Sequence, residues 1–400
     1  QEPHRAATAF PMMISVPGHR SVRSALRLCA LAALAHASAL CGASAAPAPI
    51  DAPLMVAART FEVTPPPGSP TASRTSQTLE RVYGSLKTTV VLLESGNSRL
   101  CFVTSPLSIV HDEIRNTVKA VVGRELGLPP GAVICSTSHN HTIPILPVKN
   151  PAAWSADPAV AAQGEPNAVT RDFLASLILA SKQLRQSLVP ATVEWGVARE
   201  DRFVYNRRAR RPDGRTYFVR EEDRQELGED YVGRIDPDAT VVLFKDAAAK
   251  PIAAITFYTG HPVTGYNPEQ PTSHGQWPQI ASDTLSRYLG GIPVAFMQGC
   301  CGDINSKYML TGSLAQAEQF GEYLGQSFIA ATKSLRKSLR HDLQWSRVNV
   351  GIPLAPLPAL PALEADLRSI DDFMKRANAG DPNTLECVGM NFPKALTPQY

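Results

Sequence analysis

The chain has 400 residues, of which 44% are hydrophobic and 19% charged, so its composition is that of an ordinary globular protein. This length allows one large domain or two smaller ones, with a core that is stable without disulfides. The net charge of +3 comes entirely from the first 45 residues, and the balanced remainder gives no electrostatic reason to expect nucleic acid as a partner.

The N-terminus has the order of an export signal. Three arginines between residues 20 and 27 precede an apolar run over residues 28–40, and an A-x-A-like cleavage site follows at residues 43–45. The run is short for a transmembrane helix, although an uncleaved anchor is the alternative. We therefore expect residues 1–45 to be a signal peptide and the mature protein to be exported, as a periplasmic or secreted protein.

The rest of the chain divides into a linker, a folded domain and a tail. Residues 46–78 are rich in Pro, Ala, Ser and Thr and are predicted to form a linker. The folded domain is expected over residues 79–352. The tail, residues 353–400, has many prolines and one helix, and is expected to be an incomplete continuation of the domain.

The elements of the domain follow from apolar runs and spacing. Strands are predicted at residues 88–93, 100–104, 132–136, 192–197, 239–244, 252–258, 293–297 and 348–352. Helices are predicted from residue 114 to Gly127 and at residues 169–188, 278–289, 314–331 and 360–379.

The order of these elements predicts the fold class. The strand, helix and strand between residues 100 and 136 follow a β-α-β order, which favours a parallel pair with a right-handed crossover. A pair of strands is predicted around residues 246–250, and the charged stretch 201–238 is expected to be a solvated excursion. The predicted class is α/β, with a mixed β-sheet core flanked by helices.

Three short polar loops each follow a predicted strand, at residues 137–142, 259–262 and 298–305. The first two loops and the residues just after them contain four of the six histidines beyond residue 45. In open α/β sheets, ligands bind beyond the carboxyl ends of the strands, where such loops lie. The three loops are therefore expected to converge on one site.

The His-x-His pair formed by His139 and His141 is a candidate metal or polar site. Residues i and i+2 of an extended segment point the same way, so both imidazoles face one pocket. A catalytic zinc takes about three protein ligands from His, Asp or Glu and keeps a position open for water. His261, after a second strand, strengthens this interpretation, whereas a surface loop is the alternative for an isolated His-x-His pair.

The third loop adds groups whose role the sequence leaves open. Asp303 would bind a metal, orient a histidine or cap a turn. The small residues at 298–302 indicate either a tight turn or a close backbone approach to a substrate. A thiol–imidazole dyad with Cys300 is disfavoured, because no thiol-protease signature surrounds it.

Five motifs follow one another along the chain: S-H-N-H-T-I-P at residues 138–144, N-R-R at 206–208, D-P-D-A-T-V-V-L-F at 236–244, a strand that ends at His261, and the loop from Gln298 to Asp303. In this order they resemble the N-terminal catalytic domain of the neutral and alkaline ceramidases and their exported bacterial relatives. The resemblance runs from about residue 79 to residue 330.

The resemblance implies a role for each matching residue. His139 and His261 would bind zinc, while His141 and Arg207 would line the reacting centre. Asn305 stands where ceramidases have a catalytic serine, and it is expected to hold a carbonyl or a water there. Gln298 and Asp303 are expected to contact the substrate. The family's further zinc ligands, a Glu and a Tyr, would fall beyond Tyr400 by spacing.

The resemblance implies a zinc-dependent hydrolase that cleaves an amide bond of a ceramide-like or other N-acyl substrate. Zinc would polarise the carbonyl and lower the pKa of a bound water. The expected partner is a small-molecule or lipid substrate, with membrane-surface contact through it. The alternatives are a ligand-binding protein of the same fold with little activity, which Asn305 favours, and a hydrolase of the same fold with a non-ceramide substrate.

Overall fold

The computed structural model describes residues 52–69, 78–108, 112–142, 168–210, 216–218, 233–266, 272–309, 311–338 and 342–381. The predicted signal peptide and the end of the tail lie outside these ranges. Within them, no helix combines the length and the apolar character that crossing a bilayer requires.

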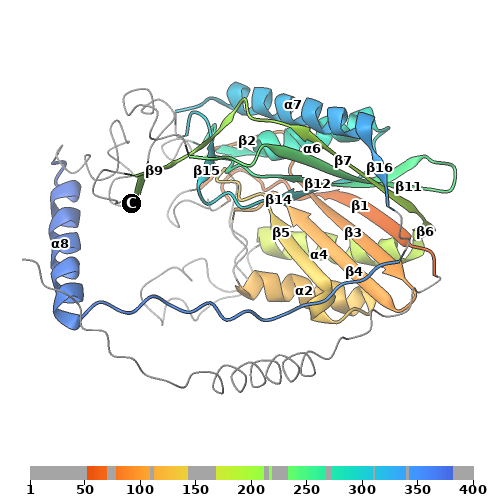
Figure 1. Ribbon diagram of the computed structural model, residues 1–400, viewed down its shortest axis with the longest axis horizontal. Helices are drawn as coiled ribbons and strands as arrows, with labels where there is room; N and C mark the ends of the chain where they lie inside the picture. The colour runs from red at the N-terminus through yellow and green to blue at the C-terminus, as the bar shows by residue number, and fades with distance from the viewer. Residues whose placement is uncertain are drawn as a thin grey trace, which may run out of the picture. The chain divides into compact units, whose positions relative to one another are not determined.

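The first sheet has the order β5-β4-β3-β1-β6. Its strands are β1 (Met55–Glu62), β3 (Lys87–Ser95), β4 (Ser98–Ser105), β5 (Val133–Thr137) and β6 (Val189–Pro190). Strands β4 and β5 are parallel, as the β-α-β order predicted, and the helix between them is α2 (Asp112–Leu126). Helix α4 (Ala168–Gln186) packs beside α2, and the two helices share a core with the sheet (Figure 1).

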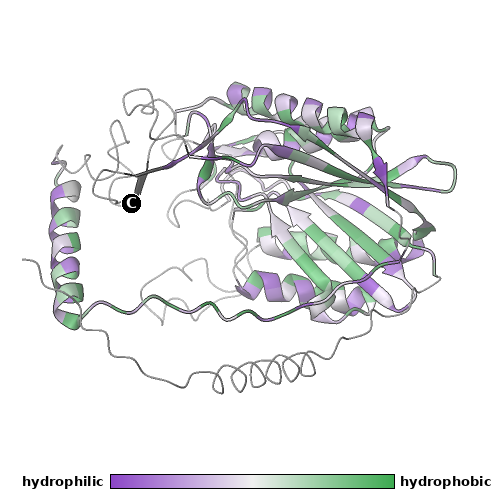
Figure 2. Cartoon of the chain, in the orientation of Figure 1, coloured by the Kyte–Doolittle hydropathy of each residue, from purple (hydrophilic) through white to green (hydrophobic). Residues whose placement is uncertain are grey.

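Strand β1 corrects the predicted linker, because all eight of its residues pair with β3 in antiparallel register. Only Val56 and Ala57 of this strand are buried, so its own apolar pattern is weak. Its partner β3 is a nearly continuous buried run, and the middle of this strand is hydrophobic, as the green in Figure 2 shows. Strand preference depends on such tertiary neighbours, which a composition rich in Ala and Thr does not reveal.

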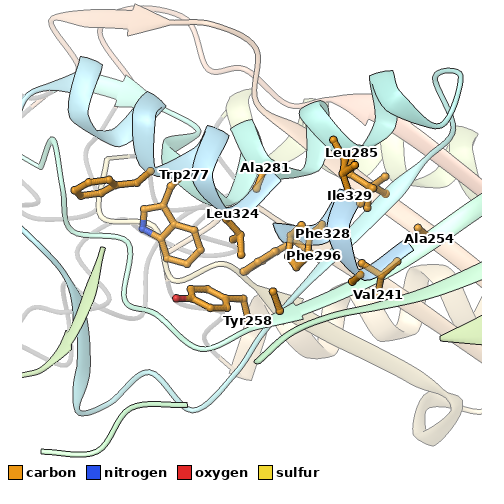
Figure 3. Close-up of a cluster of buried hydrophobic side chains, with 14 of the residues drawn as sticks. Val241, Ala254, Tyr258, Trp277, Ala281, Leu285, Phe296, Leu324, Phe328 and Ile329 are labelled. Atoms are coloured by element: carbon orange, nitrogen blue, oxygen red, sulfur yellow. The ribbon is translucent and has the colours of Figure 1, made fainter. Parts of the chain in front are cut away.

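The second sheet has the order β14-β12-β11-β7-β16. Its strands are β7 (Thr192–Arg199), β11 (Asp238–Lys245), β12 (Pro251–Tyr258), β14 (Val294–Gln298) and β16 (Arg336–Lys337). Strands β11 and β12 form the predicted pair, and β12 and β14 are parallel. Helices α6 (Gln276–Tyr288) and α7 (Leu314–Ala331) pack on each other and on this sheet, around Trp277, Tyr258 and Phe328 (Figure 3).

The two sheets face each other through a third apolar cluster. Val90 and Leu92 of β3 belong to the core beneath α2 and α4, while Val91 and Leu93 pack with Ile255 of β12. Alternation of this kind shows that both faces of β3 are buried. The order of layers is therefore helices, sheet, sheet, helices, which confirms the predicted mixed α/β class.

The remaining elements complete the description and bring two further corrections. They are β2 (Arg81–Tyr83), β8 (Val204–Asn206), β9 (Arg208–Arg210), β10 (Thr216–Phe218), β13 (Thr272–His274), β15 (Ile304–Ser306), α8 (Leu360–Asn378) and the 3₁₀ turns η1 (Pro130–Ala132) and η4 (Thr332–Ser334). Strand β8 is buried, so the stretch 201–238 is not solvated throughout. Residues 348–352 form no strand, because they have no pairing partner among the described residues and lie exposed.

Candidate metal centre

The predicted site residues come from four segments that the fold brings together. His139 and His141 follow β5, and His261 follows β12. Strand β14, the parallel neighbour of β12, also contacts β5 of the other sheet. The carboxyl ends of β5, β12 and β14 therefore lie near one another, which is the convergence that the loop positions predicted.

The three histidines form one cluster. One ring nitrogen from each lies within 4.8 Å of those of the other two, and Nε2 of His141 is 2.8 Å from Nε2 of His261. Two ligand nitrogens on one tetrahedral zinc would lie about 3.3 Å apart, given Zn–N distances of about 2.0–2.1 Å. The cluster therefore has the donor type that a metal ion requires, while the His141–His261 pair is closer than two ligands of one tetrahedral zinc.

In two of the imidazoles, Nδ1 forms a hydrogen bond with an oxygen. Nδ1 of His139 lies 3.0 Å from the carbonyl oxygen of Ser108, and Nδ1 of His261 lies 3.0 Å from Oδ1 of Asn305. Because these oxygens only accept, each contact favours a proton on Nδ1 and a lone pair on Nε2. This arrangement is typical of metal-binding histidines. At His261 the guanidinium of Arg207 competes, since it only donates and lies 3.2 Å from the same Nδ1. Nδ1 of His141 has no hydrogen-bond partner among the described residues.

The His-x-His segment forms a turn that side-chain hydrogen bonds stabilise. His139 adopts a left-handed φ of 56°, so the extended geometry that the sequence argument assumed is wrong even though the two rings share a pocket. The buried Asn140 donates to the carbonyl oxygen of His274 at 2.7 Å and accepts from the amide of Thr142 at 2.9 Å. These contacts fix the turn. The role of Asn140 could not be predicted from the sequence, because one of its partners is a backbone carbonyl far along the chain.

Arg207 is held beside the cluster by the third loop. Strand β8 pairs with β15, and the guanidinium donates through Nε and Nη2 to the carbonyl oxygen of Gly302 at 2.9 and 2.7 Å. Its Nη1 lies 3.2 Å from Nδ1 of His261. The positive charge of Arg207 therefore lies next to the histidine cluster, as the family resemblance implied.

The two residues expected to contact substrate bond to neighbouring chain segments. Oδ2 of Asp303 accepts from Nδ2 of Asn206 at 2.8 Å, which ties the third loop to the segment that carries Arg207. Nε2 of Gln298 donates to the carbonyl oxygen of Gly260 at 2.8 Å, beside His261. Oε1 of Gln298 is buried, and none of the described residues forms a hydrogen bond with it. Substrate contact by either residue stays a prediction.

Burial keeps the cluster neutral. Desolvation lowers the pKa of His139, lowers that of His141 to about 3 and lowers that of His261 well below its usual value. Repulsion by the charge of Arg207 acts in the same direction on all three. Neutral imidazole is the form that binds a metal, so protons do not compete for these nitrogens near neutral pH.

The metal-free protein is expected to lose stability as the pH falls below about 6.5, the pKa of an unfolded imidazole. Below that pH the unfolded chain binds protons that the folded cluster does not, so the free energy of unfolding decreases by up to about 1.4 kcal/mol per pH unit for each imidazole. For His141 this window extends down to about pH 3. Urea denaturation between about pH 5 and 7 measures the slope, and His141→Gln should flatten it. Equal slopes in the two proteins would contradict the assignment.

Among the comparisons with known proteins, only the comparison with solved structures finds similar proteins. No family model and no curated protein sequence matches the chain. It is similar to the neutral ceramidase from Pseudomonas aeruginosa, with a TM-score of 0.54, 14% identity, and coverage of 71% of this chain and 45% of that one. A ceramidase complexed with C2 gives a TM-score of 0.53, 15% identity, and coverage of 71% and 44%.

The similarity to these two structures concerns the fold of part of each ceramidase. The chain spans less than half the length of either ceramidase. At such low identity the similarity establishes a shared fold, and it agrees with the resemblance that the five sequence motifs carry.

Proposed function

We propose that this protein is a zinc-dependent hydrolase that cleaves an amide bond in a ceramide-like or other N-acyl substrate. The observation that carries the proposal is the cluster of His139, His141 and His261 beside Arg207, in a fold shared with neutral ceramidases. Neutral imidazole nitrogens are donors that suit zinc better than calcium or magnesium. When bound, zinc supplies a Lewis acid and lowers the pKa of water.

The protein's own side chains divide the remaining tasks. His139 and His261 are the proposed ligands, because their Nδ1 protons are already committed to oxygens and their Nε2 lone pairs face the cluster. His141 lacks such an oxygen among the described residues, and we assign it proton transfer. Arg207 contributes a fixed positive charge where an amide carbonyl develops negative charge.

The proposed setting is outside the cytoplasm. The export signal expected at residues 1–45 would deliver the protein there, and a lipid substrate would bring it to a membrane surface. Neither the compartment nor the partner follows from the fold, so both rest on the sequence.

The proposal predicts metal-dependent amide hydrolysis. The purified protein should cleave at least one member of a panel containing a short-chain ceramide, an N-acyl amino acid and the matching ester. A chelator should abolish turnover, and added zinc should restore it, because the nucleophilic water depends on the metal. Liberated fatty acid, measured by mass spectrometry, reports the reaction, and calcium or magnesium added back to the chelated protein serves as the control.

Two outcomes would redirect the proposal. Turnover that survives chelation would contradict metal catalysis. Tight binding of an N-acyl compound without turnover would favour the second candidate, a ligand-binding protein of the same fold. That candidate gains weight from one observation, since Asn305, at the position of the family's catalytic serine, is fully buried.

A further inference from the structure

Asn305 lies on the Nδ1 side of the His261 ring and has no exposed surface. Its Oδ1 is 3.0 Å from Nδ1 of His261 and accepts from Nη1 of Arg207 at 3.3 Å. Its Nδ2 is 3.0 Å from Sδ of Met309 and 3.4 Å from Oη of Tyr205. A side chain enclosed in this way does not touch a substrate, so any influence on the reaction passes through its neighbours.

The orientation of the Asn305 amide is fixed by what its neighbours donate and accept. A guanidinium only donates, so Arg207 requires the amide oxygen on its side. Rotating the amide by half a turn would set its NH₂ group against the Arg207 donors and its oxygen against Met309, whose thioether only accepts. One orientation therefore satisfies both neighbours, and it presents Oδ1 to His261.

That oxygen in turn favours one position for the proton of His261. Because Oδ1 only accepts, its 3.0 Å contact favours a proton on Nδ1 of His261, whereas Nη1 of Arg207, 3.2 Å from the same Nδ1, only donates and favours a lone pair there. With Nδ1 protonated, Arg207 donates to Oδ1 at 3.3 Å instead, and Nε2 keeps a lone pair that faces the cluster. The opposite tautomer would oppose two lone pairs at 3.0 Å. The backbone holds both residues in place, because the amide of His261 donates to the carbonyl oxygen of Ile304 at 2.8 Å and that of Ser306 donates to His261 at 3.0 Å.

We propose that Asn305 is a positioning residue. Arg207, which only donates, keeps Oδ1 of Asn305 turned toward His261, and this oxygen stabilises the His261 tautomer that has its proton on Nδ1 and binds a metal through Nε2. This role replaces the direct catalytic role that the sequence assigned to Asn305. The inference rests on the proposed function only in taking His261 as a ligand.

Three variants separate this role from a direct one. Asn305→Asp keeps an acceptor oxygen at the same place and should bind zinc as well as the native protein does. Asn305→Leu has similar volume and no acceptor, and its zinc affinity should fall by about 10- to 100-fold, the usual effect of losing such a partner. Asn305→Ser is too short to reach His261, so it should resemble Leu and gain no amidase activity. Zinc affinity is measured by competition with a chromophoric chelator.

A spectroscopic measurement tests the role without substrate. In the native metal-free protein, the ¹⁵N shifts of the His261 ring should show a protonated Nδ1, and this tautomer should be lost in Asn305→Leu and kept in Asn305→Asp. Cobalt substituted for zinc should give the native absorption spectrum in the Asp variant and an altered one in the Leu variant.

The outcomes are distinguishable from failure of the proposed function. A protonated Nε2 in the native protein, or native zinc affinity in folded Asn305→Leu, would overturn the positioning role. Absence of zinc binding by the native protein would instead refute the proposed function, while the tautomer measurement would still decide the inference.

Discussion

Replacement of His139 or His261 by alanine is expected to abolish stoichiometric zinc binding. The two residues lie on loops of different sheets, and each directs an unprotonated Nε2 toward the cluster because an oxygen holds its Nδ1 proton. Loss of either removes one of very few protein ligands, and a site reduced in this way no longer competes with buffer. Metal content, measured by inductively coupled plasma mass spectrometry after dialysis, should fall from about one zinc per chain to a small fraction.

A nearby buried histidine provides the matched control. His274 is buried and its Nδ1 accepts from the amide of Gln276 at 3.0 Å, but it stands outside the three-histidine cluster. In His274→Asn the new Oδ1 replaces that acceptor, so the variant should fold and keep its zinc. Full zinc content in a protein that lacks both His139 and His261 would refute the proposed site.

The parts of the fold that the sequence predicted are those with a strong local pattern. The apolar runs of β3, β12 and β14 and the spacing in α6 and α7 carry their own signal, because burial on one or both faces imposes it. The convergence of the histidine loops also followed from position, since loops at the carboxyl ends of neighbouring strands meet.

The parts that the sequence missed depend on distant partners. Strand β1 is stabilised by β3, and the β8–β15 pair that brings Arg207 beside His261 joins segments about 100 residues apart. The resemblance placed Asn305 in the reacting centre, whereas the structure encloses it behind His261. Neither burial nor the direction of a side chain is readable from a motif.

The role of His141 is the second large effect. Its Nε2 lies 2.8 Å from that of His261, closer than the roughly 3.3 Å expected for two ligands of one tetrahedral zinc. With no oxygen on its Nδ1 among the described residues, His141 also lacks the contact that identifies His139 and His261 as ligands. These two differences favour a residue that exchanges protons at the centre.

His141→Ala is therefore expected to keep zinc within a few-fold of the native affinity and to lose about 100- to 10,000-fold in kcat, the usual contribution of proton transfer by a positioned side chain. Zinc content and turnover of the same preparation must be measured together, because their separation is the result that matters. His141→Gln is the matched variant, since it retains a polar group of similar reach but does not exchange protons near neutral pH, and it should show the same separation. If zinc and turnover disappear together in both variants, His141 is a third ligand, and proton transfer must be assigned to another group. If turnover is unchanged while zinc remains, His141 takes no part in the reaction.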